Sequence, residues 1–295
     1  MKLIYIGIIV LFSACTMNKL FLSPTKLDRN ATVAHIYDYD NERPLELRLG
    51  PHFQPTFYDS LNNLVDPDFN IESVEFVNQK GDSLNGWFMS PKEKSNDVTL
   101  FYLHGNAGSI YYQFGLMVPF VKQGYTVFMF DYSGFGYSEG KAKIKRVFTD
   151  AQDAFAYLKT RKEYLNDKLI VYGQSLGAHL TAAISHSIEN DVDAFVMEGG
   201  FANHDEVAAQ TSGLGWFAKM MVRERYSGVD TIPLTSKPKL FIHSAEDTRV
   251  NYVNSEMLFD AAKEPKSFYS IDGRHVFGPL LYGDSINQRM LNMLK

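Results

Sequence analysis

The sequence predicts an α/β protein, built on one mostly parallel central sheet with helices on both faces, and three observations support this. The chain has 295 residues, of which 45% are hydrophobic, enough to bury one large core. From about residue 98 onward, short apolar runs alternate with longer stretches of helical spacing. Residues with catalytic chemistry follow directly after several of the apolar runs. Alternation of this kind implies right-handed crossovers in a parallel sheet.

The amino-terminal residues 1–14 are typical of a secretion signal. A short positive start precedes an apolar run over residues 3–14. That run matches the core of a signal peptide and is too short to span a bilayer. Cys15, the single cysteine of the sequence, follows two small residues, Ser13 and Ala14, where a signal peptidase would cut.

This arrangement resembles the lipobox of bacterial lipoproteins, although Phe12 stands where Leu is usual. The resemblance implies that Cys15 carries diacylglycerol, becomes the first residue and is then acylated on its amine. Several acyl chains give the stable anchoring that one chain cannot. We therefore expect a membrane-anchored lipoprotein of the bacterial cell envelope, facing outside the cytoplasm, with residues 15–45 as lipidated cysteine and polar tether. An ordinary secretory signal with a chance cysteine is the alternative.

The remaining chain, residues 46–295, is expected to form one domain. It begins with a hairpin of residues 71–77 and 84–89 around a Gly81-Asp82 turn. Further strands are expected over residues 98–103, 125–130, 168–172, 194–197, 240–242 and 267–271, and helices over residues 144–161, 176–188, 254–262 and 279–294. In such a sheet ligands bind beyond the carboxyl ends of the strands, so catalytic residues should follow the apolar runs.

Two stretches match Gly-x-Ser-x-Gly, the pattern of a nucleophilic serine in a sharp turn. Ser138 lies in the first, inside a glycine-rich loop several residues past a strand end. Ser175 lies in the second, directly after the strand 168–172 and directly before the helix 176–188. Strand, sharp turn and helix form the context that the chemistry requires, so Ser175 is the predicted nucleophile.

A serine hydroxyl needs a histidine to remove its proton and an acid to orient that histidine. His275 follows the strand 267–271 and is the predicted base. For the acid, Asp247 is preferred over its neighbour Glu246. Four competing histidines fit worse by position; they are His179, His186, His204 and His243.

Acyl transfer also requires donors for the developing oxyanion. The backbone N–H of Leu176, at the start of the helix that follows the serine, is one candidate. The backbone N–H of Asn106, in the glycine-rich segment 104–108, is the other, and His104 is expected to brace this segment. A plain strand-to-helix turn is the alternative for the segment.

Five ordered motifs resemble the alpha/beta-hydrolase domain proteins of the group that includes protein depalmitoylases. They are His104-Gly105-Asn106-Ala107-Gly108, Asp131-Tyr132-Ser133-Gly134-Phe135-Gly136, Gly173-Gln174-Ser175-Leu176-Gly177, Ile242-His243-x-x-x-Asp247 and Gly273-Arg274-His275. The resemblance covers roughly residues 70–295 and implies the fold and the Ser–Asp–His triad. One departure is Ser244, which stands where that group usually has Gly. The resemblance says little about the substrate, because one fold hosts many reactions.

A short cap insertion is expected over about residues 202–237. Its apolar stretch 213–222 either lines an acyl pocket or packs against the core. The expected reaction is hydrolysis of a small acyl ester or thioester through an acyl-enzyme, with no metal and no organic cofactor. A peptidase with the same triad and a non-catalytic lipid-anchored binding protein are the alternatives. The net charge of −5 and the lack of a basic run argue against nucleic acid as a partner; the oligomeric state stays open.

Overall fold

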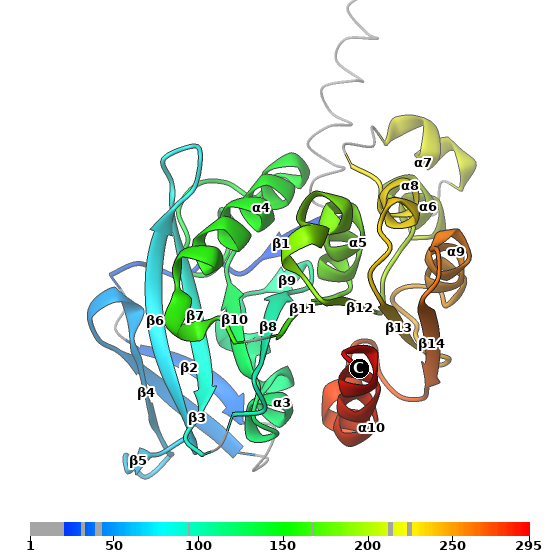
Figure 1. Ribbon diagram of the computed structural model, residues 1–295. Helices are drawn as coiled ribbons and strands as arrows, with labels where there is room; N and C mark the ends of the chain where they lie inside the picture. The colour runs from blue at the N-terminus through cyan, green and yellow to red at the C-terminus, as the bar shows by residue number, and fades with distance from the viewer. Residues whose placement is uncertain are drawn as a thin grey trace, which may run out of the picture.

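The computed structural model describes residues 21–30, 33–38, 43–93, 95–166, 168–211, 215–222 and 226–295 (Figure 1). Its centre is an eight-stranded sheet in the order β14-β13-β12-β11-β8-β10-β7-β6. The strands are β6 (Phe69–Val77), β7 (Ser83–Pro91), β8 (Val98–Leu103), β10 (Thr126–Phe130), β11 (Lys168–Gln174), β12 (Ala194–Glu198), β13 (Lys239–Ser244) and β14 (Lys266–Ile271). All neighbours pair in parallel except β6 with β7 and β7 with β10.

The two faces of the sheet bury different side chains because residues alternate along a strand. On β8, Phe101 and Leu103 belong to one hydrophobic cluster and Leu100 and Tyr102 to the other. All four side chains are fully buried. Both faces are therefore covered, which explains why β8 is a continuous apolar run.

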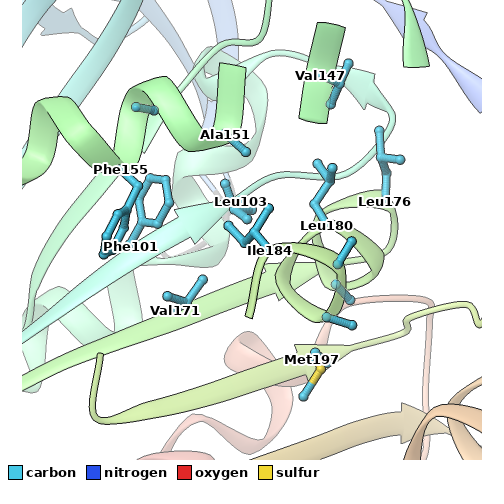
Figure 2. Packing of buried hydrophobic residues seen from close by; sticks show 14 of the residues in the cluster. Phe101, Leu103, Val147, Ala151, Phe155, Val171, Leu176, Leu180, Ile184 and Met197 are labelled. Carbon is cyan, nitrogen blue, oxygen red and sulfur yellow. The ribbon is translucent and has the colours of Figure 1, made fainter. Parts of the chain in front are cut away.

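Helices α4 (Ile144–Thr160) and α5 (Leu176–Ile188) cover the first face. Figure 2 shows Val147 and Phe155 of α4 and Leu180 and Ile184 of α5 packed over side chains of the sheet. The buried positions of α4 recur at three- and four-residue spacing, as expected of a helix with one apolar side. This packing fixes the start of α5, and with it Ser175.

The opposite face is covered by helices from both halves of the chain and by a second, small sheet. Helices α3 (Val118–Lys122) and α10 (Gly278–Met293) contact each other there. The small antiparallel sheet contains β2 (Val33–Asp38), β3 (Arg43–Leu49), β4 (Pro55–Tyr58) and β5 (Leu64–Val65). Leu47 and Phe57 of this sheet join the same buried cluster as Ile286 and Met290 of α10.

The predicted mostly parallel sheet with helices on both faces is confirmed. Each of the eight predicted strands and four predicted helices is present, with ends shifted by at most two residues. The predicted helix 254–262 is α9 (Val253–Ala261), and the predicted helix 279–294 is α10. The short α2 (Ile110–Gln113) and α3 were not predicted.

The predicted tether over residues 15–45 is corrected where the structure describes it. Phe21 and Leu22 are buried in the main core, at 3% and 5% exposure. β1 (Ser23–Pro24) pairs in parallel with β9 (Ala107–Gly108). With β2 also part of the small sheet, the folded domain starts well before residue 46. The apolar residues between positions 21 and 45 are few and irregularly spaced, so sequence periodicity could not reveal the strands in this segment. Cys15 and the predicted signal over residues 1–14 lie outside the described residues.

The predicted insertion over residues 202–237 contains three described α-helices between β12 and β13. They are α6 (His204–Thr211), α7 (Trp216–Met221) and α8 (Gly228–Thr231). α8 packs on α5, while α6 and α7 pack on each other. In the part of the chain that the structure describes, no helix is long and apolar enough to cross a membrane.

Candidate active site

Ser175 stands at the turn between β11 and α5, in a backbone conformation that a non-glycine residue rarely adopts. Its φ of 55° and ψ of −115° lie in the positive-φ region, which strains a residue with a Cβ. The Ser175 N–H donates to the carbonyl of Glu198 at 2.8 Å, which ties the turn to the end of β12. The side chain is half-buried. The strained turn thus presents the hydroxyl at the carboxyl edge of the sheet.

Two glycines make this turn sterically possible. A Cβ on Gly177 would lie 1.8 Å from the carbonyl oxygen of Leu103, and one on Gly173 would lie 2.1 Å from the carbonyl oxygen of Gly177. Both contacts are to backbone atoms, which cannot rotate away as a flexible side chain can. Glycine is therefore required at both positions.

Gly177→Ala is expected to lower the free energy of unfolding by about 3 kcal/mol, because the added methyl collides with β8. Gly50→Ala is the matched control, since its Cβ would meet no atom closer than 3.7 Å, and its effect should stay within about 0.5 kcal/mol. Urea unfolding of both variants measures the difference. Equal stability of the two would contradict the described packing at the turn.

His275 and Asp247 meet beyond the ends of β14 and β13. The distance from His275 Nδ1 to Asp247 Oδ2 is 2.5 Å. The other carboxylate oxygen, Oδ1, accepts the N–H groups of Arg249 at 2.8 Å and Val250 at 3.0 Å. With Nδ1 facing the acid, Nε2 is the ring nitrogen left to receive a proton. This is the arrangement that orients a catalytic base.

The Asp247 side chain is 1% exposed. Burial raises the pKa of this carboxyl, but hydrogen bonds with His243 and His275 outweigh burial, and the pKa lies well below its usual range. His243 Nε2 lies 3.2 Å from Asp247 Oδ2. Asp247 is thus a carboxylate at neutral pH, as an acid that stabilises an imidazolium must be.

Ser175 and His275 line the same pocket, a cavity of about 280 Å³. The end of β12 contacts both residues. The carbonyl of Glu198 accepts the Ser175 N–H, and a Cβ on the next residue, Gly199, would lie 3.0 Å from the His275 ring. Among the described residues no hydrogen bond joins the Ser175 hydroxyl to His275. Contacts of this kind often tighten only when substrate binds.

The segment with Asn106 lies beside the serine. A Cβ on Gly105 would sit 3.6 Å from Ser175 Cβ, so the backbone of this segment reaches the pocket closely. Gln113 of α2 holds the segment, because its Oε1 accepts the Gly105 N–H at 3.2 Å and its Nε2 donates to the carbonyl of Ala107. Asn106 lines the pocket, and Leu176 is the first residue of α5. In the described chain neither of these two amides donates a hydrogen bond to another residue.

The amino-terminal strand β1 supports this segment from outside. The Ser23 N–H donates to the Asn106 carbonyl at 2.9 Å, and the Thr25 N–H donates to the Gly108 carbonyl at 3.0 Å. The Thr25 carbonyl accepts from the N–H of Gly136 at 2.9 Å. Part of the predicted tether therefore positions a candidate oxyanion donor.

His104 is fully buried and its Nδ1 lies 2.8 Å from the Gly105 carbonyl. Burial lowers the pKa of His104 to about 3, so the ring is neutral. Its ring packs against Tyr132 at a centroid distance of 4.3 Å. These contacts agree with the expectation that His104 braces the segment.

The competing candidates lie elsewhere. Ser138 is fully buried; its hydroxyl donates to the Asp131 carbonyl at 2.6 Å and accepts the Asn85 N–H at 2.9 Å. Glu246 accepts the Gly273 N–H at 2.9 Å, and within the described residues no hydrogen bond joins it to His275. Ser244, the departure from the family pattern, donates to the Gly273 carbonyl at 2.5 Å and so joins the two loops that carry Asp247 and His275.

The four competing histidines are also placed away from the pocket. His179 Nδ1 lies 2.9 Å from the Phe201 carbonyl, and His204 is buried beside the ring of Phe21. His186 is about half exposed and pairs with Glu189. His243 contacts Asp247 but does not line the pocket, so it supports Asp247 from outside the cavity.

A buried polar network behind the serine was not predicted from the sequence. Glu198 Oε2 accepts from Gln174 Nε2 at 2.6 Å and from the Tyr172 hydroxyl at 2.8 Å, and its Oε1 accepts the Gly278 N–H at 2.8 Å. Gln174 Nε2 also lies 3.1 Å from the Val276 carbonyl. Burial raises the pKa of Glu198, and these hydrogen bonds oppose that rise. The network joins the residue before Ser175 to the residue after His275. A charged residue that ends an apolar run is the signal that could have revealed it.

The pocket is lined by short polar segments and by apolar side chains. Its residues are Gly105, Asn106, Ala107, Gly108, Tyr112, Gln113, Leu116, Ser175, His275, Val276 and Phe277. Of the predicted cap stretch 213–222, the described residues 215–222 do not line the pocket, and Trp216 and Phe217 are exposed. Residues 213–214 lie outside the described part. Across the described residues, no group of three or more His, Cys, Asp or Glu is placed to hold a metal ion.

Comparison with known proteins gives consistent likenesses. A family model described as alpha/beta hydrolase fold matches residues 98–227. YfhR, an uncharacterized protein of Escherichia coli K12, is 32% identical over 248 residues, which cover 81% of this chain and 86% of YfhR. The human alpha/beta hydrolase domain-containing protein 17B is 26% identical over 225 residues, 74% of this chain and 73% of that protein. An esterase structure from Pyrococcus furiosus matches with a TM-score of 0.65 at 18% identity, over 93% of this chain and 97% of that one.

Proposed function

Because the chain belongs to the alpha/beta hydrolase family, we propose that it is a serine hydrolase that cleaves a carboxylic ester or thioester through an acyl-enzyme. The observation that carries this proposal is the convergence of Ser175 and His275 on one pocket, with Asp247 2.5 Å behind the histidine. Nucleophilic acyl transfer requires a serine, a base beside it and a buried carboxylate behind the base, and these three residues supply them.

The reaction starts at the Ser175 hydroxyl. His275 Nε2 takes the hydroxyl proton while Oγ attacks the acyl carbon, and Asp247 stabilises the imidazolium that forms. The proton then passes from His275 to the departing alcohol or thiol, leaving the acyl group on Ser175. Water enters next, His275 removes its proton, and the acid is released with the hydroxyl restored.

The oxyanion of each tetrahedral intermediate is proposed to lie between the N–H groups of Asn106 and Leu176. The Leu176 amide is at the amino-terminal end of α5, where the helix dipole favours negative charge. A well-placed donor of this kind contributes about 3 kcal/mol to transition-state stabilisation. Gln113 and β1 hold the Asn106 segment in place beforehand, so little reorganisation is needed during the reaction.

The pocket favours a small acyl group over a peptide. Its volume of about 280 Å³ is at the lower end of small-molecule sites, and Tyr112, Leu116 and Phe277 give it apolar walls. Among its described lining residues there is no carboxylate that could bind a peptide amine. The pocket thus supports an ester or thioester substrate and gives the peptidase alternative no support.

We also propose that the enzyme is a lipoprotein anchored through Cys15 in the bacterial cell envelope. The support is the apolar run over residues 3–14 and the small residues before the cysteine. Mass spectrometry of the mature amino terminus from producing cells, beside a Cys15→Ser variant, tests this part of the proposal. Cleavage without a lipid would favour the ordinary secretory signal.

Initial rates on a matched panel test the proposed reaction. The panel holds p-nitrophenyl esters from acetyl to palmitoyl, the corresponding acyl thioesters, and an aminoacyl p-nitroanilide as peptidase substrate. We expect turnover of esters or thioesters with the highest kcat/KM for short chains, since long chains exceed the pocket. Faster cleavage of the anilide would favour the peptidase, and no turnover by folded protein would favour the binding protein.

A further inference from the structure

Two large aromatic side chains are exposed on α7. Trp216 and Phe217 are 61% and 58% exposed, and their rings stack at a centroid distance of 4.0 Å. Isolated exposed apolar residues need no explanation, but adjacent aromatic residues on one short helix form a patch. Tryptophan is enriched at the interface between bilayer and water, where its ring lies at the level of the headgroups.

The first described residue of the chain lies next to the helix pair that carries this patch. The ring of Phe21 packs edge-on against His204, the first residue of α6, at 4.9 Å. α6 packs against α7, and an ion pair between Glu206 and Lys219 joins the two helices. Phe21, the first described residue, therefore lies close to the pair of helices α6 and α7.

The distance from Phe21 to the proposed lipid anchor is short. Cys15 precedes Phe21 by only six positions in the sequence. Six residues span at most about 20 Å when fully extended. An anchor at Cys15 would thus hold the bilayer within about 20 Å of Phe21, on the side of the molecule where α7 lies.

A basic cluster lies toward the same end of the molecule. Lys80, Lys141, Lys143, Lys145 and Arg146 surround one hollow, and the four lysines are exposed. The Arg146 guanidinium forms an ion pair with the Asp82 carboxylate at 2.6 Å. The positive charge of the cluster that Asp82 does not neutralise therefore comes from the four lysines. Figure 1 shows the β6–β7 turn, which carries Lys80, and α7 both at the upper end of the molecule. Because four of the six residues 141–146 are basic, the expectation that the chain has no basic run is corrected for this segment, although the net charge is −5.

We propose that this end of the molecule docks on the lipid bilayer: Trp216 and Phe217 enter the interface, and the four lysines contact anionic headgroups. The inference rests on the proposed Cys15 anchor, which sets the distance. Lysines near an anionic surface each add attraction that salt screens. Ser23, two residues beyond Phe21, binds Asn106 of the pocket, so docking would also place the catalytic pocket near the membrane surface.

The two tryptophans of the chain allow a direct test. Trp216 is exposed and Trp87 is fully buried, so any quencher in the bilayer should reach the first and not the second. The full lipidated chain is reconstituted into phosphatidylcholine–phosphatidylglycerol vesicles whose acyl chains are brominated. Flotation measures anchoring, tryptophan emission measures docking, and ester hydrolysis is followed in the same preparation. Trp216→Phe is the matched control.

We expect the anchored wild-type chain to lose the Trp216 share of its emission and the Trp216→Phe variant to show no quenching. Lys141→Glu with Lys143→Glu should reduce the quenching in anionic vesicles and leave hydrolysis of a water-soluble ester unchanged. A chain that floats but is quenched by brominated lipid no more in the wild type than in Trp216→Phe, each relative to unbrominated vesicles, would overturn docking and leave the anchor standing. A chain that does not float would overturn both, and hydrolysis would report separately on the catalytic proposal.

Discussion

Ser175→Ala is expected to lower kcat for ester hydrolysis by about 10⁴- to 10⁶-fold, the range seen when the nucleophile of a serine hydrolase is removed. The residual rate would come from the oxyanion donors and from substrate binding. Stability should change little, because the Ser175 side chain is half-buried and its hydroxyl makes no hydrogen bond to another described residue. Steady-state kinetics on the best ester, with thermal unfolding of the same samples, measures both effects.

Ser138→Ala is the matched control for this variant, because Ser138 lies in the other Gly-x-Ser-x-Gly match. Its buried hydroxyl makes two hydrogen bonds, so its removal should cost about 1 to 2 kcal/mol of stability. Its kcat should remain close to that of the wild type. The assignment of the nucleophile fails if Ser138→Ala loses activity while Ser175→Ala keeps it.

Asp247→Asn is expected to lower kcat by about 10⁴-fold with little change in KM. An amide at this position cannot stabilise the imidazolium, and it can donate a hydrogen bond to His275 Nδ1, which would favour the wrong tautomer. The low pKa of Asp247 means that the wild-type group is charged at neutral pH. Kinetics on the same ester as for Ser175→Ala measures the loss.

Glu246→Gln separates this effect from a general change in the loop. Glu246 is adjacent in sequence but exposed, and it contacts Gly273 in place of His275. Its variant should keep nearly full activity. If Glu246→Gln loses kcat while Asp247→Asn keeps it, then Glu246 is the orienting acid and Asp247 is not.

Much of the central sheet could be predicted from the sequence because its strands are buried on both faces. The apolar run of β8, for example, has ends that match the structure, since its side chains all face a buried layer. The sharp turn at Ser175 could be placed because Gly173 and Gly177 are sterically required there. The roles of the site residues remain predictions that the variants above test.

Other features depend on contacts that no local pattern encodes. β1 has two exposed residues and is held by backbone hydrogen bonds to the segment with Asn106, so its side chains carry no periodic signal. Glu198 and Gln113 act through hydrogen bonds to other segments of the chain, and neither sits in a motif. α2 and α3 are too short for helical periodicity to stand out.

Labelling with a fluorophosphonate probe, followed by mass spectrometry of the labelled peptide, tests the central claim most directly, because the probe reacts with activated serines. The wild-type chain is compared with Ser175→Ala, His275→Ala and Ser138→Ala. We predict a label on Ser175 that is lost in the first two variants and survives in Ser138→Ala. No label on folded wild-type protein, or a label on another serine, would contradict the assignment of Ser175 as the nucleophile; the first of these would favour a non-catalytic protein on the same fold.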